Sequence, residues 1–147
     1  MQGRALLTDE DATAGLRAVA VLLLLIVTVL SLLPNPPEGG AGGVFGAWLS
    51  RLLTGSDAYG DKAAHAFAYL ATAGATGAGF GQTGRRLLGA AAGLFAWSLV
   101  LEGLQAAGGA RTGDAWDALA NLVGIVGGTV LALGFRRAVR AFGLPLR

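Results

Sequence analysis

Three separate regions of the sequence carry polar and ionisable residues beside an apolar segment. Within each region these residues recur mainly at intervals of three or four, which places their side chains on one face of a helix. Ionisable groups in or beside a membrane-spanning helix are costly unless they pair or reach water, so they indicate a functional site. The candidate ligand-binding residues are Asp61, Lys62, His65 and Tyr69; Glu102 and Gln105; and Arg111, Asp114, Asp117 and Asn121.

His65 is the only histidine in the chain, and its neighbours suit acid–base chemistry. Asp61 precedes it by four residues and Tyr69 follows it by four. A carboxylate can therefore orient the imidazole while a hydroxyl donates a hydrogen bond. With Glu102 as a second titratable group, His65 is the candidate acid or base of an enzyme. The same pattern is also typical of a histidine that only packs between helices.

Glu102 lies deeper in its apolar segment than Asp61 does. A carboxylate at such a position needs a cationic partner, and the sequence offers Lys62, His65 and Arg111. An ion pair of this kind can lock two helices together, and it can equally belong to a site that contacts a substrate.

Asp114 and Asp117 could join His65 and Glu102 in an oxygen-rich site with one imidazole, which would suit a divalent cation. The spacing matches no metal-binding signature, however, and ion pairs with the nearby lysine and arginine account for the same residues. One of the two aspartates can also have a purely structural role, because a carboxylate caps the first turn of a helix and interacts favourably with the helix N-terminus. The sequence contains no phosphatase-like histidine pair, glycine-rich phosphate loop, nucleophile elbow or zincin motif. We therefore predict no metal and no other cofactor.

The composition is that of a membrane protein. Hydrophobic residues make up 54% of the 147 residues and charged residues only 14%, whereas soluble domains contain about 25% charged residues. Cysteine is absent, which excludes disulfides, thiolate metal sites and cysteine nucleophiles. The net charge of +2 reflects arginines near the segment ends, a distribution that suits anionic lipid headgroups and not nucleic acid.

We predict an all-α membrane protein, a single domain over residues 1–147, with four spanning helices in a compact bundle. The predicted spans are about 16–33, 63–80, 87–107 and 115–135.

The first predicted span could instead be a signal peptide, but the acidic residues 9–11 do not fit a positive leading region and no cleavage site follows. Between the first and second spans, apolar residues from Val44 to Leu53 recur at intervals of four, with Trp48 among them. This pattern predicts a short helix that lies in the membrane interface and does not cross it.

The fourth segment has a polar, small-residue stripe and an apolar remainder. We expect the stripe to face protein or water and the remainder to face lipid. The stripe consists of Asp114, Asp117, Asn121, Gly124 and Gly128. The apolar remainder consists of Trp116, Leu119, Leu122, Val123, Val126 and Val130.

Small residues at intervals of four predict close contact between helices. Gly74 and Ala78 of the second segment and Gly124 and Gly128 of the fourth fit the small-xxx-small pattern of membrane helix seams. A compositional bias toward alanine, glycine and arginine, typical of GC-rich genomes, is the alternative explanation.

The arginines set the expected orientation. Most of them precede the first span, separate the second from the third, or follow the fourth, and such residues favour the cytoplasmic side. These arginines are Arg4, Arg17, Arg85, Arg86, Arg136, Arg137, Arg140 and Arg147. We therefore predict a multi-pass protein of the bacterial cytoplasmic (inner) membrane with both termini in the cytoplasm. In this topology the three polar sets converge at the outer face.

The same polar residues carry a family resemblance. The pattern Asp61-Lys62-x-x-His65-x-x-x-Tyr69, then Glu102-x-x-Gln105, then Arg111-x-x-Asp114-x-x-Asp117-x-x-x-Asn121-x-x-Gly124 resembles the VanZ-like family of small bacterial membrane proteins. The resemblance extends over about residues 61–128 and implies a multi-helix integral membrane protein. It also suggests a link to resistance to the lipoglycopeptide teicoplanin, but it supplies no reaction.

From these observations we expect an outward-facing polar pocket that recognises an amphiphilic molecule of the cell envelope. The expected ligand is a lipid-linked envelope intermediate or a lipoglycopeptide, and the other expected partners are membrane lipids. The alternative is a membrane-embedded enzyme that acts on a lipid-linked substrate, with His65 and Glu102 as acid and base. A third interpretation is an accessory protein in which the polar residues only lock the helices.

Overall fold

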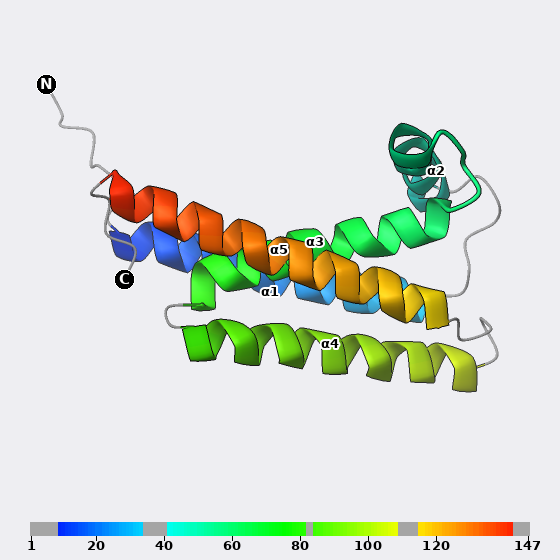
Figure 1. Cartoon of the computed structure of the whole chain (residues 1–147). Helices are drawn as coiled ribbons and strands as arrows, with labels where there is room; N and C mark the ends of the chain where they lie inside the picture. The colour runs from blue at the N-terminus through cyan, green and yellow to red at the C-terminus, as the bar shows by residue number, and fades with distance from the viewer. Residues whose placement is uncertain (1–8, 34–40, 82–83, 109–114, 143–147) are drawn as a thin grey trace, which may run out of the picture.

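The structure is a computed structural model that describes residues 9–33, 41–81, 84–108 and 115–142. These residues form helices and no strand, so the all-α prediction is confirmed for them. The five helices, shown in Figure 1, are α1 (Asp9–Leu32), α2 (Ala41–Thr54), α3 (Gly60–Phe80), α4 (Gly84–Ala107) and α5 (Ala115–Ala141).

Three of the helices in the described part of the chain, α1, α4 and α5, are long and apolar enough to cross a membrane. Many of their large apolar side chains are exposed, among them Leu22 at 57%, Leu88 at 69% and Val130 at 59%. Such side chains are suited to contact with lipid, because a membrane removes the cost that they would carry in water. The chain is therefore a membrane protein.

α3 is the central helix, since it contacts each of the other four. Tyr69, Thr72, Ala73 and Gly77 are among its buried residues, and Tyr69 and Ala73 join Val27, Leu94 and Ile125 in the apolar core. A helix enclosed by its neighbours needs little lipid-facing apolar surface. This position is consistent with the finding that α3, which we predicted to be a span, is not among the described helices that are apolar enough to cross a membrane by their own composition.

The closest helix contact is the seam between α3 and α5. A Cβ atom built on Gly124 would overlap the carbonyl oxygen of Ala66, and one built on Gly128 would overlap that of Leu70. Gly74 faces the backbone of Gly128 across the same seam. The predicted small-residue contact is therefore confirmed, and it rests on the absence of side chains where two backbones meet.

The stripe predicted along the fourth segment is also confirmed within the described residues. Asp117, Asn121, Gly124 and Gly128 are all buried, while the residues assigned to the apolar remainder are exposed. Their exposed fractions run from 36% at Leu122 to 66% at Trp116. Asp114 lies outside the described residues.

α3 and α5 run in one direction, and α1 and α4 run in the other. The start of α1 and the end of α5 therefore lie at the same end of the bundle, beside the start of α4 (Figure 1). We call this end the arginine end, because it carries Arg17, Arg85, Arg86, Arg136 and Arg140. The opposite end, where α3 and α5 begin, is called the site end.

At the arginine end, two arginines donate hydrogen bonds to backbone carbonyl groups in the last turn of α3. The backbone N–H of Gly81 donates to the carbonyl oxygen of Gly77 at 3.0 Å. The Nη1 atom of Arg136 donates to Ala78 O at 2.9 Å, and the Nε atom of Arg17 donates to Gly79 O at 3.0 Å. Three of the four final carbonyl groups of α3 thus have donors, and the two guanidinium charges complement the negative end of the helix dipole.

α2 confirms that a short helix lies between the first two predicted spans. It has 14 residues, too few to cross a bilayer core of ~30 Å, and it runs crosswise to the other helices (Figure 1). Gly46 lies against the backbone of Gly60 at the start of α3, and Phe45 packs edge-on against Phe67 with ring centroids 5.2 Å apart.

The outer surface of α2 is amphipathic. Trp48 is 58% exposed and Leu52 67% exposed, whereas Arg51 forms an exposed ion pair with Asp57 at 2.6 Å. A hydrogen bond from Arg51 and its positive charge lower the pKa of Asp57. Exposed apolar side chains beside a charged pair are typical of helices that lie in a membrane interface.

Candidate functional site

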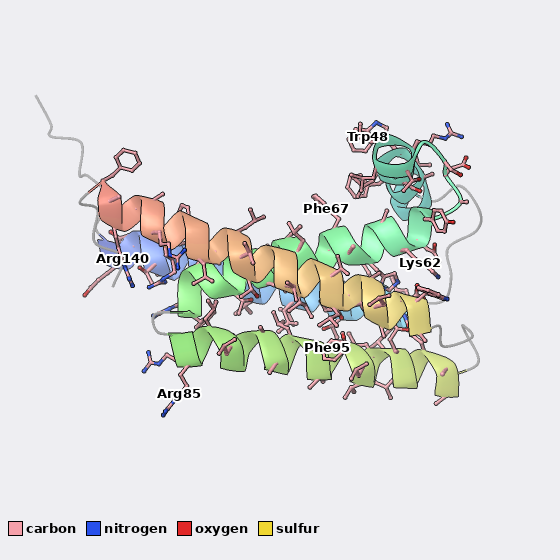
Figure 2. The ribbon with its side chains drawn as sticks, viewed as in Figure 1. Trp48, Lys62, Phe67, Arg85, Phe95 and Arg140 are labelled. Carbon is pink, nitrogen blue, oxygen red and sulfur yellow. The ribbon has the colours of Figure 1, made fainter. Side chains whose placement is uncertain are left out.

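The polar residues of α3, α4 and α5 meet at the site end. We use the name polar cluster for Lys62 and His65 of α3, Glu102 of α4, and Asp117 and Asn121 of α5. Figure 2 shows Lys62 at the opposite end of the bundle from Arg85 and Arg140. The cluster is held together because Gly124, one turn after Asn121, brings α5 against α3 at Ala66, one residue after His65.

Asn121 links the other two helices of the cluster. The Nδ1 atom of His65 lies 3.0 Å from Asn121 Oδ1, and Asn121 Nδ2 donates a longer bond of 3.4 Å to Glu102 Oε1. The amide oxygen only accepts hydrogen bonds, so Nδ1 carries the proton. In the neutral ring Nε2 then keeps its lone pair. At 1% exposure, Asn121 is inaccessible and serves to orient both partners.

Lys62 lies between two carboxylates. Its Nζ atom is 2.8 Å from Asp61 Oδ2 and 2.8 Å from Asp117 Oδ1. Asp117 is only 5% exposed, so its charge requires a nearby cation. The ammonium group is close enough to form an ion pair, yet Asp117 Oδ1 accepts no hydrogen bond among the described residues. The distance defines an ion pair, and the direction of approach is unfavourable for a hydrogen bond.

Asp61 is the more accessible partner of Lys62. Its side chain is 43% exposed, against 7% for that of Asp117. Asp61 accepts a hydrogen bond from Lys62 at 2.8 Å and holds the ammonium group at the edge of the cluster.

His65, Glu102 and Asp117 converge although they belong to three different helices. One ligand atom from each lies within 4.8 Å of the corresponding atoms of the other two. His65 and Glu102 are partly exposed, and Asp117 is buried. This arrangement can transfer protons between a ring nitrogen and a carboxylate, and it can also surround a cation.

Two of the predicted site residues do not belong to the polar cluster. Tyr69 is 1% exposed and is part of the apolar core, although it lies within electrostatic reach of Glu102. The side-chain amide of Gln105 donates to the carbonyl oxygen of Ser31 in α1, and Trp97 of α4 similarly donates to Thr28 Oγ1 at 3.0 Å. Gln105 therefore fastens α4 to α1, a contact that residue spacing within α4 does not reveal.

The orientation of His65 differs from the sequence-based prediction. We expected Asp61, four residues earlier, to orient the ring, but Nδ1 is bonded to Asn121 while Asp61 pairs with Lys62. A partner on the neighbouring helix replaces one on the same helix because the glycine seam brings α5 so close. Arg111 and Asp114, which we also predicted to belong to the site, lie outside the described residues.

No family model matches the chain, and no curated protein or solved structure shows significant similarity to it.

Proposed function

We propose that the chain is a VanZ-like protein in which α1, α3, α4 and α5 all cross the bacterial cytoplasmic membrane as a compact four-helix bundle. α3 has 21 residues, which at ~1.5 Å per residue is long enough for the hydrocarbon core. Its neighbours shield its less apolar surface from lipid. α2 lies in the interface beside the site end.

In this proposal the arginine end faces the cytoplasm and the site end faces outward. Arginine-rich segment ends favour the cytoplasmic side, and the five arginines that define the arginine end come from three helices. Both termini are then cytoplasmic.

Single cysteines test this orientation. The chain has no native cysteine, and Gly43 and Gly84 are both exposed with open space around them. In intact cells Gly43→Cys should react with an impermeant thiol reagent, and Gly84→Cys should react only after the membrane is opened. Labelling of Gly84→Cys alone in intact cells would place the polar cluster on the cytoplasmic side.

We further propose that the polar cluster recognises an amphiphilic envelope molecule, either a lipid-linked envelope intermediate or a lipoglycopeptide. The observation that carries this proposal is the convergence of five polar side chains from three membrane helices at one end of the bundle. Ionisable groups within membrane helices are uncommon, and by default they indicate a functional site. Teicoplanin-type resistance is the role that the family resemblance suggests.

Each polar group has a chemical task in this proposal. Lys62 contacts a phosphate or carboxylate of the ligand, since its ammonium lies at the accessible edge beside Asp61. Asp61 and Asp117 hold this cation, and the more accessible Asp61 accepts hydrogen bonds from sugar or amine groups. Arg111 and Asp114 would extend the same surface, while Gln105 and Tyr69 support it from their helix contacts.

Binding can be measured with purified protein in lipid nanodiscs, using a fluorescent polyprenyl-diphosphate sugar and, separately, teicoplanin. Lys62→Gln should weaken binding of the preferred probe by roughly 10- to 100-fold, the value of a hydrogen bond to a charged group. Arg51→Gln is the matched control, because it removes an exposed cation near the same end. Equal loss in both variants would indicate general charge attraction and would contradict a specific site.

The alternative function is an enzyme acting on a lipid-linked substrate. The observation in its favour is that His65, Glu102 and Asp117 place a ring nitrogen and two carboxylates within 4.8 Å of one another. In that case His65 and Glu102 exchange the protons of the reaction.

A further inference from the structure

We propose that His65, Glu102 and Asp117 bind a divalent transition-metal ion, with Zn²⁺ as the expected ion. This inference goes beyond the proposed function, because it concerns a bound ion and does not depend on which amphiphile is recognised. The evidence lies in the geometry of the three ligands, in the residue that orients two of them, and in the state of the buried aspartate.

The three ligand atoms are close enough to share one ion. They lie within 4.8 Å of one another, and ligands placed ~2.1 Å from a tetrahedral zinc ion are roughly 3.4 Å apart. Side-chain movements of about 1 Å would therefore complete the coordination. One imidazole with two carboxylates suits zinc better than Mg²⁺ or Ca²⁺, which prefer oxygen ligands alone.

Asn121 orients two of the ligands as an outer-shell residue does in metal sites. Its side-chain oxygen lies 3.0 Å from Nδ1 of His65 and accepts the proton there, so Nε2 is the ring nitrogen that would ligate the metal. Its side-chain nitrogen donates to Glu102. Metal-binding histidines almost always donate their second ring N–H in this way, and ligating carboxylates are themselves hydrogen-bonded.

Asp117 supplies an independent indication of a ligand. It is 5% exposed, and its buried Oδ1 atom accepts no hydrogen bond from any described residue. Lys62 neutralises this oxygen by proximity alone, at 2.8 Å. A buried carboxylate oxygen that is held by a cation and by no hydrogen bond is compatible with metal binding, since a metal can take the lone pair that a hydrogen bond would otherwise occupy.

The lysine does not prevent metal binding. When an ion takes Asp117 Oδ1, the ammonium of Lys62 keeps its second partner Asp61, also at 2.8 Å, so no buried charge is stranded.

Three protein ligands leave a fourth position free on a tetrahedral ion, as in catalytic zinc sites. His65 and Glu102 are partly exposed, so an ion can enter from the site end and keep contact with water or an anionic oxygen there.

The test is metal binding by the full-length protein purified in detergent. After removal of metals by a chelator, titration with ZnCl₂ alone should show saturable binding of about one ion per chain, the number that one three-ligand site holds. MgCl₂ should not compete. Glu102→Gln and Asp117→Asn, which keep the side-chain shape, should each weaken zinc binding by more than the roughly 10- to 100-fold expected for Asn121→Ala as an outer-shell change.

Asp57→Asn is the matched control, because Asp57 is a carboxylate in an exposed ion pair just before α3 and outside the proposed ligand set. It should bind zinc like the wild type. No saturable binding by the wild type, or equal weakening in Asp57→Asn, would overturn the proposal. If the ligand variants do not fold, the unfolding temperature of the wild type is measured instead. ZnCl₂ should raise this temperature to a plateau, and MgCl₂ should not. If ZnCl₂ does not raise it, the site is refuted.

Discussion

Gly124→Ala should destabilise the protein, although alanine favours helices more than glycine does. The new Cβ atom would overlap the backbone oxygen of Ala66, which cannot move aside as a side chain can. Overpacking of this kind costs about 1–3 kcal/mol, while the gain in helix propensity is at most ~1 kcal/mol. The net effect should be a loss of about 1–2 kcal/mol, measured as a lower unfolding temperature in detergent.

Gly134→Ala is the control for this substitution. Gly134 lies in the same helix, is exposed, and has nothing within 4 Å of a built Cβ. The control should be neutral or slightly more stable. Gly124→Ala should also weaken ligand or zinc binding, because separating α5 from α3 pulls Asn121 away from His65. Unchanged stability in Gly124→Ala would mean that the seam is looser than the structure indicates.

The seam is also the feature that the sequence predicted best. Residues such as Asn121, Gly124 and Gly128 recur with the helical period, and this regularity alone indicates that they face one neighbour. The approximate positions of the helices could be predicted for the same reason, but α1 begins at Asp9 and α5 ends at Ala141, well outside the predicted spans 16–33 and 115–135. The strongly apolar segments could be recognised without any tertiary information, because the apolar length that a helix needs to cross a membrane is encoded in its own residues.

Contacts between helices could not be predicted in the same way. Sequence spacing offers His65 a partner on its own helix, Asp61, and gives no reason to prefer Asn121 of α5. It likewise gives no reason to pair Gln105 with a backbone oxygen of α1. These choices depend on which helix faces which, and on how closely the glycines allow the backbones to approach.

α3 illustrates the same limit. A helix is identified as a span by its own composition, and α3 is not among the candidate spans, but it contacts every other helix, which reduces the surface that must face lipid. The proposed metal ligands could not be predicted from the sequence either. His65, Glu102 and Asp117 come from three helices, so no linear motif connects them, and the absence of a signature in the sequence carried no information about their convergence.

Binding and catalysis are separated by replacing the histidine. His65→Gln keeps a hydrogen-bonding side chain beside Asn121 but cannot exchange a proton near neutral pH. If the protein is a binder, the variant should keep most of its affinity for the polyprenyl-diphosphate probe, with little dependence on pH. If His65 is a general acid or base, conversion of a lipid-linked precursor should fall by a factor of roughly 10²–10⁴.

Conversion should be followed for wild type and variant between about pH 5 and 8, the range in which histidines commonly titrate. A bell-shaped profile in the wild type that disappears in the variant would favour the enzyme over the binder. The zinc content of both proteins must be measured alongside, because a metal-ligating His65 predicts loss of the ion from the variant. Loss of conversion with the zinc content unchanged would assign proton transfer to the ring itself, whereas joint loss of both would assign His65 to the metal site. A wild type that converts nothing would leave recognition as the function of the polar cluster.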